Sequence, residues 1–300
     1  MRRHAPLTLV ARRFARHRLA VASAGLLLVL AAGAALAPAV EAVLGIDADA
    51  VSLFNRFAAA SVDHPLGTDE LGRDVLVRLL YGGRVSLAVG LAAALGSALI
   101  GTSVGLAAGF YGGRVDVFLM RLTDGVIALP FLPLLIVLAA LDLTKLGIPQ
   151  HIAAAEHVNL VRIVVIVSLV GWTTVARLVR GTALALRQQL FVEAARAQGA
   201  GAMRIMAVHI LPNLASPVIV ATTLAAGNMM LLESVLSFLG LGIQPPTPSW
   251  GNLLTNAQEL IWSAPALAFY PGMLIFFTVI ALNFLGDGLR DALDPRTIQG

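Results

Sequence analysis

The chain has 300 residues, of which 58% are hydrophobic and 13% are charged; its mean hydropathy of +0.85 excludes an ordinary soluble domain, where about 25% of residues are charged. The formal net charge of +4 comes from basic residues in short clusters between apolar segments, which is typical of membrane topology and not of a nucleic-acid-binding stripe. Cysteine is absent, which excludes disulfides and thiolate metal sites, and the one lysine, Lys145, precedes leucine, so the chain lacks a Walker A loop.

The basic N-terminus is followed by an apolar segment long enough to span a membrane. Residues 1–18 contain six arginines and no acidic residue, and the apolar segment runs from Leu19 to Val40. It matches the roughly 20 residues of a spanning helix. It also exceeds the roughly 7–15 residues of a signal-peptide core, which is the alternative that the basic start leaves open. We expect a first transmembrane helix that begins inside the cell and ends outside.

The longest polar segment, residues 41–83, precedes the second apolar segment. Thr68 is typical of a helix N-cap, and the acidic residues at 69 and 70 favour a helix N-terminus. Apolar residues then recur at helical spacing: Val75, Leu76, Leu79 and Leu80. The pattern predicts an amphipathic helix at the outer surface that leads into the second span.

The second apolar segment, Val85 to Phe110, carries small residues at four-residue steps. They are Ala93, Ser97, Gly101, Gly105 and Gly109. Residues four apart share one helix face, and in lipid small side chains let two helix backbones pack closely. A flexible, glycine-rich helix is the alternative, but the register over five steps favours a packing face that is buried against another helix.

The third apolar segment runs from Val115 to Ala140 and contains Pro130 and Pro133. Proline lacks an N–H and clashes with the preceding turn, so these residues predict a kink, which could serve gating or packing alone. A polar outer loop, residues 141–157, follows, and the fourth segment covers residues 158–178.

Histidines occur in two of the outer loops. His64 stands beside Asp63, and the loop of residues 141–157 contains His151, Glu156 and His157. Neither group has the ligand spacing of a zinc site, so we expect solvated loop residues and no metal.

The fifth apolar segment, Leu214 to Leu236, is interrupted by Pro217 and carries Glu233. A carboxylate near membrane depth is costly and marks a functional candidate. Because the segment ends within a few residues, we expect Glu233 at the outer interface, with a role in gating or in the substrate path as the alternative. Glycines and prolines follow, and then Trp250, which is expected to be an interfacial aromatic residue. The sixth segment begins at 267 and ends at 285.

A polar stretch between the fourth and fifth segments, residues 191–212, reads FVEAARAQGAGAMRIMAVHILP. Its candidate contact residues are Glu193, Ala194, Ala195, Gly199 and Pro212. Alanines form helices and have small side chains, so a partner protein can approach the backbone closely. Gly199 should end the first helix, and a second short helix from 203 to 210 should stop at Pro212. The stretch predicts two short surface helices that fit a groove in a partner, or an ordinary helix–turn–helix loop.

This spacing of Glu-Ala-Ala, Gly199 and Leu-Pro resembles the cytoplasmic loop of ABC importer permeases. Three further stretches narrow the resemblance to the C-type permeases of dipeptide, oligopeptide and nickel importers. They are GTDELGRD with YGGRVSL (residues 67–87), LESVLSFLGLGIQPPTPSWGNLL (residues 232–254) and GDGLRDALDPR (residues 286–296). The resemblance extends from about residue 12 to residue 296.

The resemblance implies an all-α polytopic fold of six transmembrane helices, the bundle of type I ABC importer permeases, with both termini cytoplasmic. It divides the chain into an N-terminal part (1–83), a permease core (84–287) with the coupling loop 191–212, and a cytoplasmic tail (288–300). The positive-inside rule agrees with this topology, because fifteen of the basic residues fall on inner segments and six on outer ones.

The implied partners are a sister permease that forms a heterodimer, two ATP-binding cassette ATPase subunits inside the cell, an extracytoplasmic substrate-binding protein, and membrane lipid. The ATPases would bind ATP and Mg and would contact Glu193, Ala194, Ala195 and Gly199, so this chain would be neither an enzyme nor a cofactor-binding subunit.

We therefore expect a permease of the bacterial cytoplasmic (inner) membrane that moves dipeptides or oligopeptides by alternating access. Import of nickel or another small solute by the same family is the alternative. An ion-coupled secondary transporter would need mid-membrane carboxylates and pseudo-symmetric halves, and an intramembrane enzyme would need paired catalytic groups. The sequence shows neither pattern.

Overall fold

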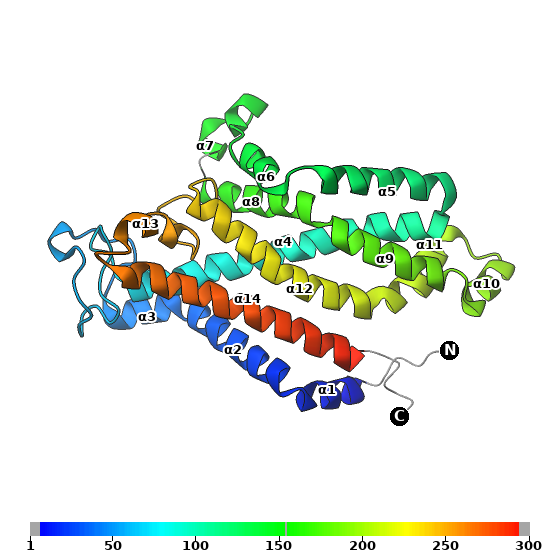
Figure 1. Ribbon diagram of the computed structural model, residues 1–300, viewed down its shortest axis with the longest axis horizontal. Coiled ribbons are helices and arrows are strands. Elements are labelled where there is room, and N and C mark those ends of the chain that lie inside the picture. Colours follow the sequence, from blue (N-terminus) through cyan, green and yellow to red (C-terminus); the bar gives the residue numbers. More distant parts are fainter. Residues whose placement is uncertain (1–6, 154, 294–300) are drawn as a thin grey trace.

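The computed structural model describes residues 7–153 and 155–293, and its long helices lie side by side in an elongated bundle (Figure 1). The helices are α1 (Leu7–Arg16), α2 (Arg18–Ala35), α3 (Ala37–Leu44), α4 (Val75–Tyr111), α5 (Gly113–Ala128), α6 (Phe131–Ala139), α7 (Gln150–Ala153), α8 (Glu156–Gly171), α9 (Thr173–Leu186), α10 (Leu190–Ala197), α11 (Ala202–Arg204), α12 (Leu211–Phe238), α13 (Ala257–Leu260) and α14 (Pro265–Leu293). A π-helical turn (Ile205–Ile210) joins α11 to α12, and three 3-10 turns lie in loops: Leu53–Asn55, Leu143–Leu146 and Asn252–Leu254. The described ranges contain no β-strand, only an isolated bridge between Thr68 and Asp74.

Four helical runs are long and apolar enough to cross a membrane without a sharp bend: α2, α4, residues 202–238 and α14. Two helix pairs meet the same criteria only together, because α5 and α6 are bent by 86° and α8 and α9 by 47°. When each bent pair counts as one span, the chain has six, and the predicted all-α, six-span fold is confirmed in this form.

The two ends of the bundle are formed by different elements. Figure 1 shows α1, α10 and the last turns of α14 gathered at one end, whereas α3, α13 and the loop of residues 45–74 lie at the other. We call these the inner and outer ends, following the positive-inside assignment. Arg2, Arg3 and Arg296, which the sequence also assigned to the inside, lie outside the described residues.

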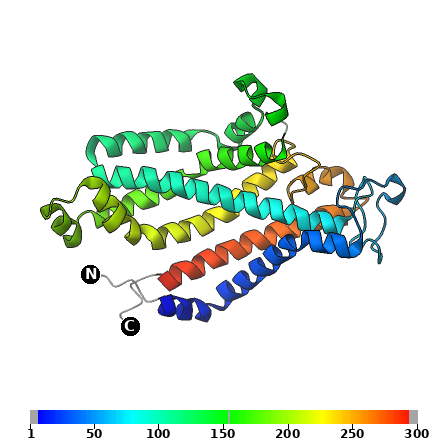
Figure 2. The ribbon, with the colours of Figure 1, turned by 180° about the vertical axis from the view of Figure 1, so that it is seen from behind.

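Helix α4 is the centre of the bundle and packs against α2, α8, α9 and α12; it is the long cyan helix in Figure 2. Its N-cap is Asp74, whose carboxylate accepts a hydrogen bond from the backbone N–H of Val77 at 2.9 Å. Its C-terminal cap is Gly112, which has a φ of 67°.

The expected N-cap at Thr68 is wrong. Thr68 lies in the loop before α4, where its hydroxyl accepts a hydrogen bond from the N–H of Ala58 at 2.8 Å and donates to the carbonyl of Asn55. Because the helix begins only at Val75, the predicted surface helix is the first part of α4 itself.

Three prolines affect the helices differently from what the sequence predicted. Pro130 is the N-cap of α6, so the predicted kink is a full break with a bend of 86°. Pro217 lies inside α12 without interrupting it, and Pro212 lies in the first turn of α12, where a missing N–H is tolerated. The helix therefore does not stop at Pro212 as predicted; it runs through the π-helical turn, and the side-chain amide of Asn213 donates to the carbonyl of His209 at 2.7 Å.

Candidate functional site

The candidate site is a pair of short helices at the inner end, α10 and α11, with the π-helical turn that follows them (Figure 1). We call residues 190–210 the inner hairpin. Helix α10 ends in a Schellman motif: the N–H of Gly199 donates to the carbonyl of Arg196 at 2.9 Å, and the N–H of Ala200 donates to that of Ala195 at 3.0 Å. Gly199 has a φ of 80°, where a side chain is strained, so the residue type fixes the turn.

The inner hairpin has one buried and one exposed face. Val192 is fully buried and Ala195 is 7% exposed. Both belong to an apolar cluster whose other members are Phe110, Val175, Val179, Ala183, Ile205, Met206, Ile210 and Leu214. Glu193, Ala194 and Gly199 are exposed. The five residues that the sequence grouped are thus divided, since Ala195 faces the protein interior and Pro212 belongs to the start of α12.

Two large apolar side chains project from the hairpin. Leu190 is 82% exposed and Met203 is 73% exposed, on either side of the exposed Ala194 along the chain. Two large exposed apolar side chains on this pair of short helices are candidates for contact with a partner protein.

The hairpin is tied to the bundle by two arginines and by the chain itself. The guanidinium of Arg196 lies 5.6 Å from the ring centre of Phe110, and Arg187 donates to the carbonyl of Phe110 at 3.0 Å. The hairpin also continues into α12 without a break, as residues 202–238 form one helical run. The hairpin is therefore joined to α4 by side-chain contacts and to α12 by the chain itself.

The small residues of α4 lie where its backbone is closest to α8 and α9. A Cβ added at Gly101, Gly105 or Gly109 would lie 2.6, 2.4 or 2.8 Å from a backbone carbonyl oxygen of the region Trp172–Arg180. Nearer the outer end, Ser97 donates to the carbonyl of Ser168, and Ser168 donates to that of Ala93 at 3.1 Å. Backbone contact of this kind leaves no room for a side chain on α4.

Glu233, near the outer end of α12, is completely buried. Its carboxylate accepts hydrogen bonds from the hydroxyls of Ser86 in α4 at 3.1 Å and Ser237 in α12 at 2.8 Å. Trp250, which was expected at the interface, is 2% exposed, and its indole N–H donates to the carbonyl of Leu79 at 2.8 Å. Both side chains are buried because the outer loop folds back onto α4, a contact that apolar periodicity does not reveal.

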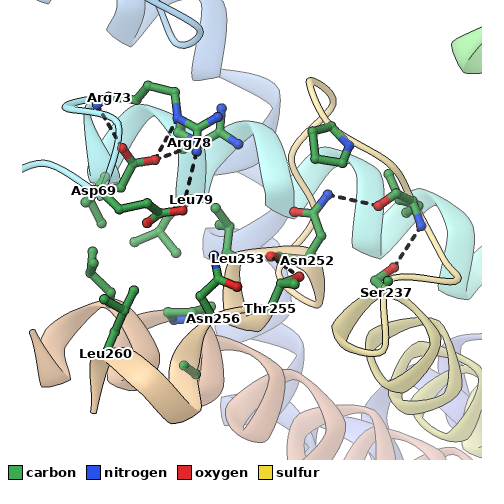
Figure 3. Close-up of a pocket in the computed structure, with 18 of the residues that line it drawn as sticks. Asp69, Arg73, Arg78, Leu79, Ser237, Asn252, Leu253, Thr255, Asn256 and Leu260 are labelled. Carbon is green, nitrogen blue, oxygen red and sulfur yellow. Dashed lines mark hydrogen bonds and ion pairs between the residues drawn. The ribbon is translucent and has the colours of Figure 1, made fainter. Parts of the chain in front are cut away.

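A cavity of about 290 Å³ lies at the outer end between α4, the loop after α12 and the start of α14. Figure 3 shows Asp69, Arg73 and Arg78 across this cavity from Asn252 and Ser237. Asp69 accepts from the Nε of Arg73 at 2.7 Å, and Arg78, which is 3% exposed, donates to Asp49 at 3.0 Å. The ion pair of Arg73 with Asp69 lies within the loop of residues 45–74, whereas the ion pair of Arg78 with Asp49 joins this loop to α4. The sequence did not identify either pair.

A second, larger hollow of about 540 Å³ opens on the side of the bundle between α9, α12 and α14. Most of its lining is apolar, but it also contains Thr174, Ser216, Asn228 and Arg290. Thr174 and Asn228 are exposed within spanning helices. Polar groups are costly against lipid, so this face suits contact with protein or water.

The histidines expected to be loop residues form no metal site in the described part of the chain. Within residues 7–153 and 155–293, no three His, Cys, Asp or Glu side chains gather closely enough to hold an ion. His64 instead lies 3.1 Å from the carboxylate of Asp74 beside the start of α4.

The fold defines a multi-pass helical membrane protein with a pair of short helices at one end. A family model described as binding-protein-dependent transport system inner membrane component matches residues 101–299. The chain therefore belongs to this family of ABC-transporter permeases and is a multi-pass component of the inner membrane. In this family the ATPase is a separate subunit, and the permease is not itself an enzyme and has no cofactor of its own.

Curated relatives agree with the family. A dipeptide transport system permease protein of Alkalihalophilus pseudofirmus is 40% identical over 81% of this chain and 75% of its own length. A glutathione transport system permease protein of Pectobacterium atrosepticum is 40% identical over 95% and 89%, respectively. A putative peptide transport system permease protein of Brucella abortus is 38% identical over 97% and 92%.

Proposed function

We propose that this permease subunit imports short peptides in a complex with a sister permease, two ATP-binding cassette ATPases and an extracytoplasmic substrate-binding protein. The relatives named for dipeptides, for glutathione (itself a tripeptide) and for peptides support this substrate class. Nickel or another small solute is the second candidate from the sequence, but no relative cited here carries such a name. In this proposal residues 1–83, 84–287 and 288–300 are the N-terminal part, the permease core and the cytoplasmic tail, with both termini inside.

The observation that carries the proposal is the inner hairpin, which combines an exposed apolar face with a rigid attachment. Leu190, Ala194 and Met203 would seat in a groove of an ATPase, with Glu193 and Gly199 at the edge of the contact. Val192 and Ala195 anchor the hairpin to the bundle. ATP-driven movement of the ATPases would then be passed to α12 as a rigid displacement.

The polar hollow between α9, α12 and α14 supports the alternating-access part of the proposal. Its exposed Thr174 and Asn228 would face the sister permease and the peptide path, where water or peptide groups satisfy them. Closure of the ATPases would shift the population between a state open outside and one open inside.

Substitution of Ala194 by glutamate tests the docking face. A charge forced into an apolar contact without a partner costs roughly 2–4 kcal/mol, so we expect ATP-driven dipeptide uptake in proteoliposomes to fall at least about 30-fold. Ala15→Glu, at an exposed position of α1 at the same end, is the matched control and should keep normal uptake. Normal uptake by Ala194→Glu at normal abundance would rule out docking through this face.

A competition assay tests the substrate. Uptake of radiolabelled dipeptide, glutathione and nickel is measured separately, each with and without an excess of the same unlabelled solute. We expect ATP-driven, competed uptake of a peptide; if only nickel is taken up, the second candidate is correct.

A further inference from the structure

The carboxylate of Glu233 is the meeting point of α4, α12 and the loop of residues 239–256 at the outer end. Its side chain is fully buried, and its two oxygens accept from different helices. Oε2 accepts from the hydroxyl of Ser86 in α4, and Oε1 accepts from that of Ser237 in α12. A carboxylate suits this place because both of its oxygens are acceptors.

Each of these serines also holds the loop. The backbone N–H of Trp250 donates to the hydroxyl oxygen of Ser86 at 3.1 Å, and the N–H of Ile243 donates to that of Ser237 at 3.0 Å. A hydroxyl has one hydrogen, so a serine that donates to Glu233 remains able to accept from the loop. Two chains of hydrogen bonds therefore run from Glu233 to two separate points of the loop; Figure 3 shows the bond at Ser237.

The loop backbone lies directly against the helix that carries Glu233. A Cβ added at Gly242 would lie 2.6 Å from the Cα of Ser237, and one added at Gly251 would lie 2.6 Å from the Cα of Ser234. Contacts this close leave the loop no room to slide along α12, so helix and loop move together while the hydrogen bonds hold.

The same helix begins at the inner hairpin. Residues 202–238 form one helical run, and Glu233 and the inner hairpin lie near its opposite ends. We propose that Glu233 is a positioning residue that clamps the loop 239–256 to α4 and α12, so that displacement of the inner hairpin moves this loop at the outer mouth. The inference rests on the proposed function, because it takes the ATPase-driven hairpin as the source of motion.

Substitution of Glu233 by glutamine changes the hydrogen bonds of the clamp and keeps the volume of the side chain. The amide has nearly the same size, but it offers one acceptor oxygen and a donor NH₂ group, so only one of the two serines can still donate to it. The other serine can only accept from the NH₂ group, so its own hydroxyl hydrogen loses its buried acceptor and that chain of hydrogen bonds is weakened. A buried polar group that loses its partner shifts an equilibrium by roughly tenfold or more.

The experiment uses the purified importer complex in proteoliposomes, with Gln244→Cys as a reporter. Gln244 is exposed at the loop, and the chain has no cysteine of its own, so a membrane-impermeant maleimide labels this chain at one place. Labelling is compared with and without ATP and vanadate, alongside ATP hydrolysis and uptake of a radiolabelled dipeptide. We expect nucleotide-dependent labelling in the parent protein.

In the Glu233→Gln variant we expect that dependence to be lost and dipeptide uptake per ATP hydrolysed to fall about tenfold, while ATP hydrolysis persists. Ser86→Ala removes the chain of hydrogen bonds on the α4 side and should give a loss of the same order. Thr278→Val is the matched control, because the hydroxyl of Thr278 is buried but donates only to the carbonyl of Leu274 in its own helix, at 2.7 Å.

Normal nucleotide-dependent labelling and normal coupling in Glu233→Gln would overturn the clamp. So would labelling that is independent of nucleotide in a parent protein that still takes up dipeptide. A parent complex with no ATP-driven uptake of any of the tested solutes would instead overturn the proposed function, and the inference with it.

Discussion

Replacement of Gly105 by alanine adds one methyl group at the closest approach of α4 to α9. The new Cβ would lie 2.4 Å from the carbonyl oxygen of Ala176 and 2.9 Å from the Cβ of Val179. Because Cβ contacts under 3.0 Å essentially never occur and the first of these atoms is backbone, the two helices must separate by at least about 0.6 Å. Overpacking of this kind costs about 1–3 kcal/mol.

Gly125→Ala provides the control, because a Cβ at Gly125 in α5 would meet nothing within 4 Å. Both substitutions gain the same helix propensity, about 1 kcal/mol, so the difference between the two variants isolates the clash. We expect Gly105→Ala to be less stable than Gly125→Ala by about 2 kcal/mol in SDS unfolding from mixed micelles. Equal stability of the two variants would refute the close backbone packing of α4 on α9.

Three further substitutions test separate parts of the structure. Asp74→Ala removes the N-cap of α4 and should lower stability in the same assay by about 1 kcal/mol, and an unchanged unfolding midpoint would contradict the cap. Ala195→Glu places a charge in the apolar cluster under the hairpin and should reduce the amount of folded protein on size-exclusion chromatography, whereas Ala194→Glu should not. Pro212→Ala should leave uptake and stability within about 0.5 kcal/mol of the parent, because the helix already runs through this position; loss of uptake would show that Pro212 has a role of its own.

The sequence predicted the spans well because each depends on local hydropathy. Apolar length placed all six segments, and Pro130 marked the position of the break between α5 and α6. The bend at Trp172 was not predicted, because it lies inside the apolar segment of residues 158–178, which contains no proline.

The errors arose where long-range contacts decide the structure. Thr68 has the local chemistry of an N-cap, but Asp74 takes that role because the loop is held by bonds to Asn55 and Ala58. Glu233 and Trp250 are buried because the outer loop returns to α4. Gly82 and Gly83 of α4 leave room there for the indole ring of Trp250. That pair was the one local signal that could have indicated the contact.

The central claim, that this chain works as the membrane subunit of an ATP-driven importer, is tested most directly by its partners. The measurement is purification of the full chain from its native membrane in mild detergent, followed by mass spectrometry of the intact complex. The account predicts recovery of a second permease and two ATPase subunits, with their association weakened by Ala194→Glu. Recovery of the chain alone, or only with copies of itself, would contradict it.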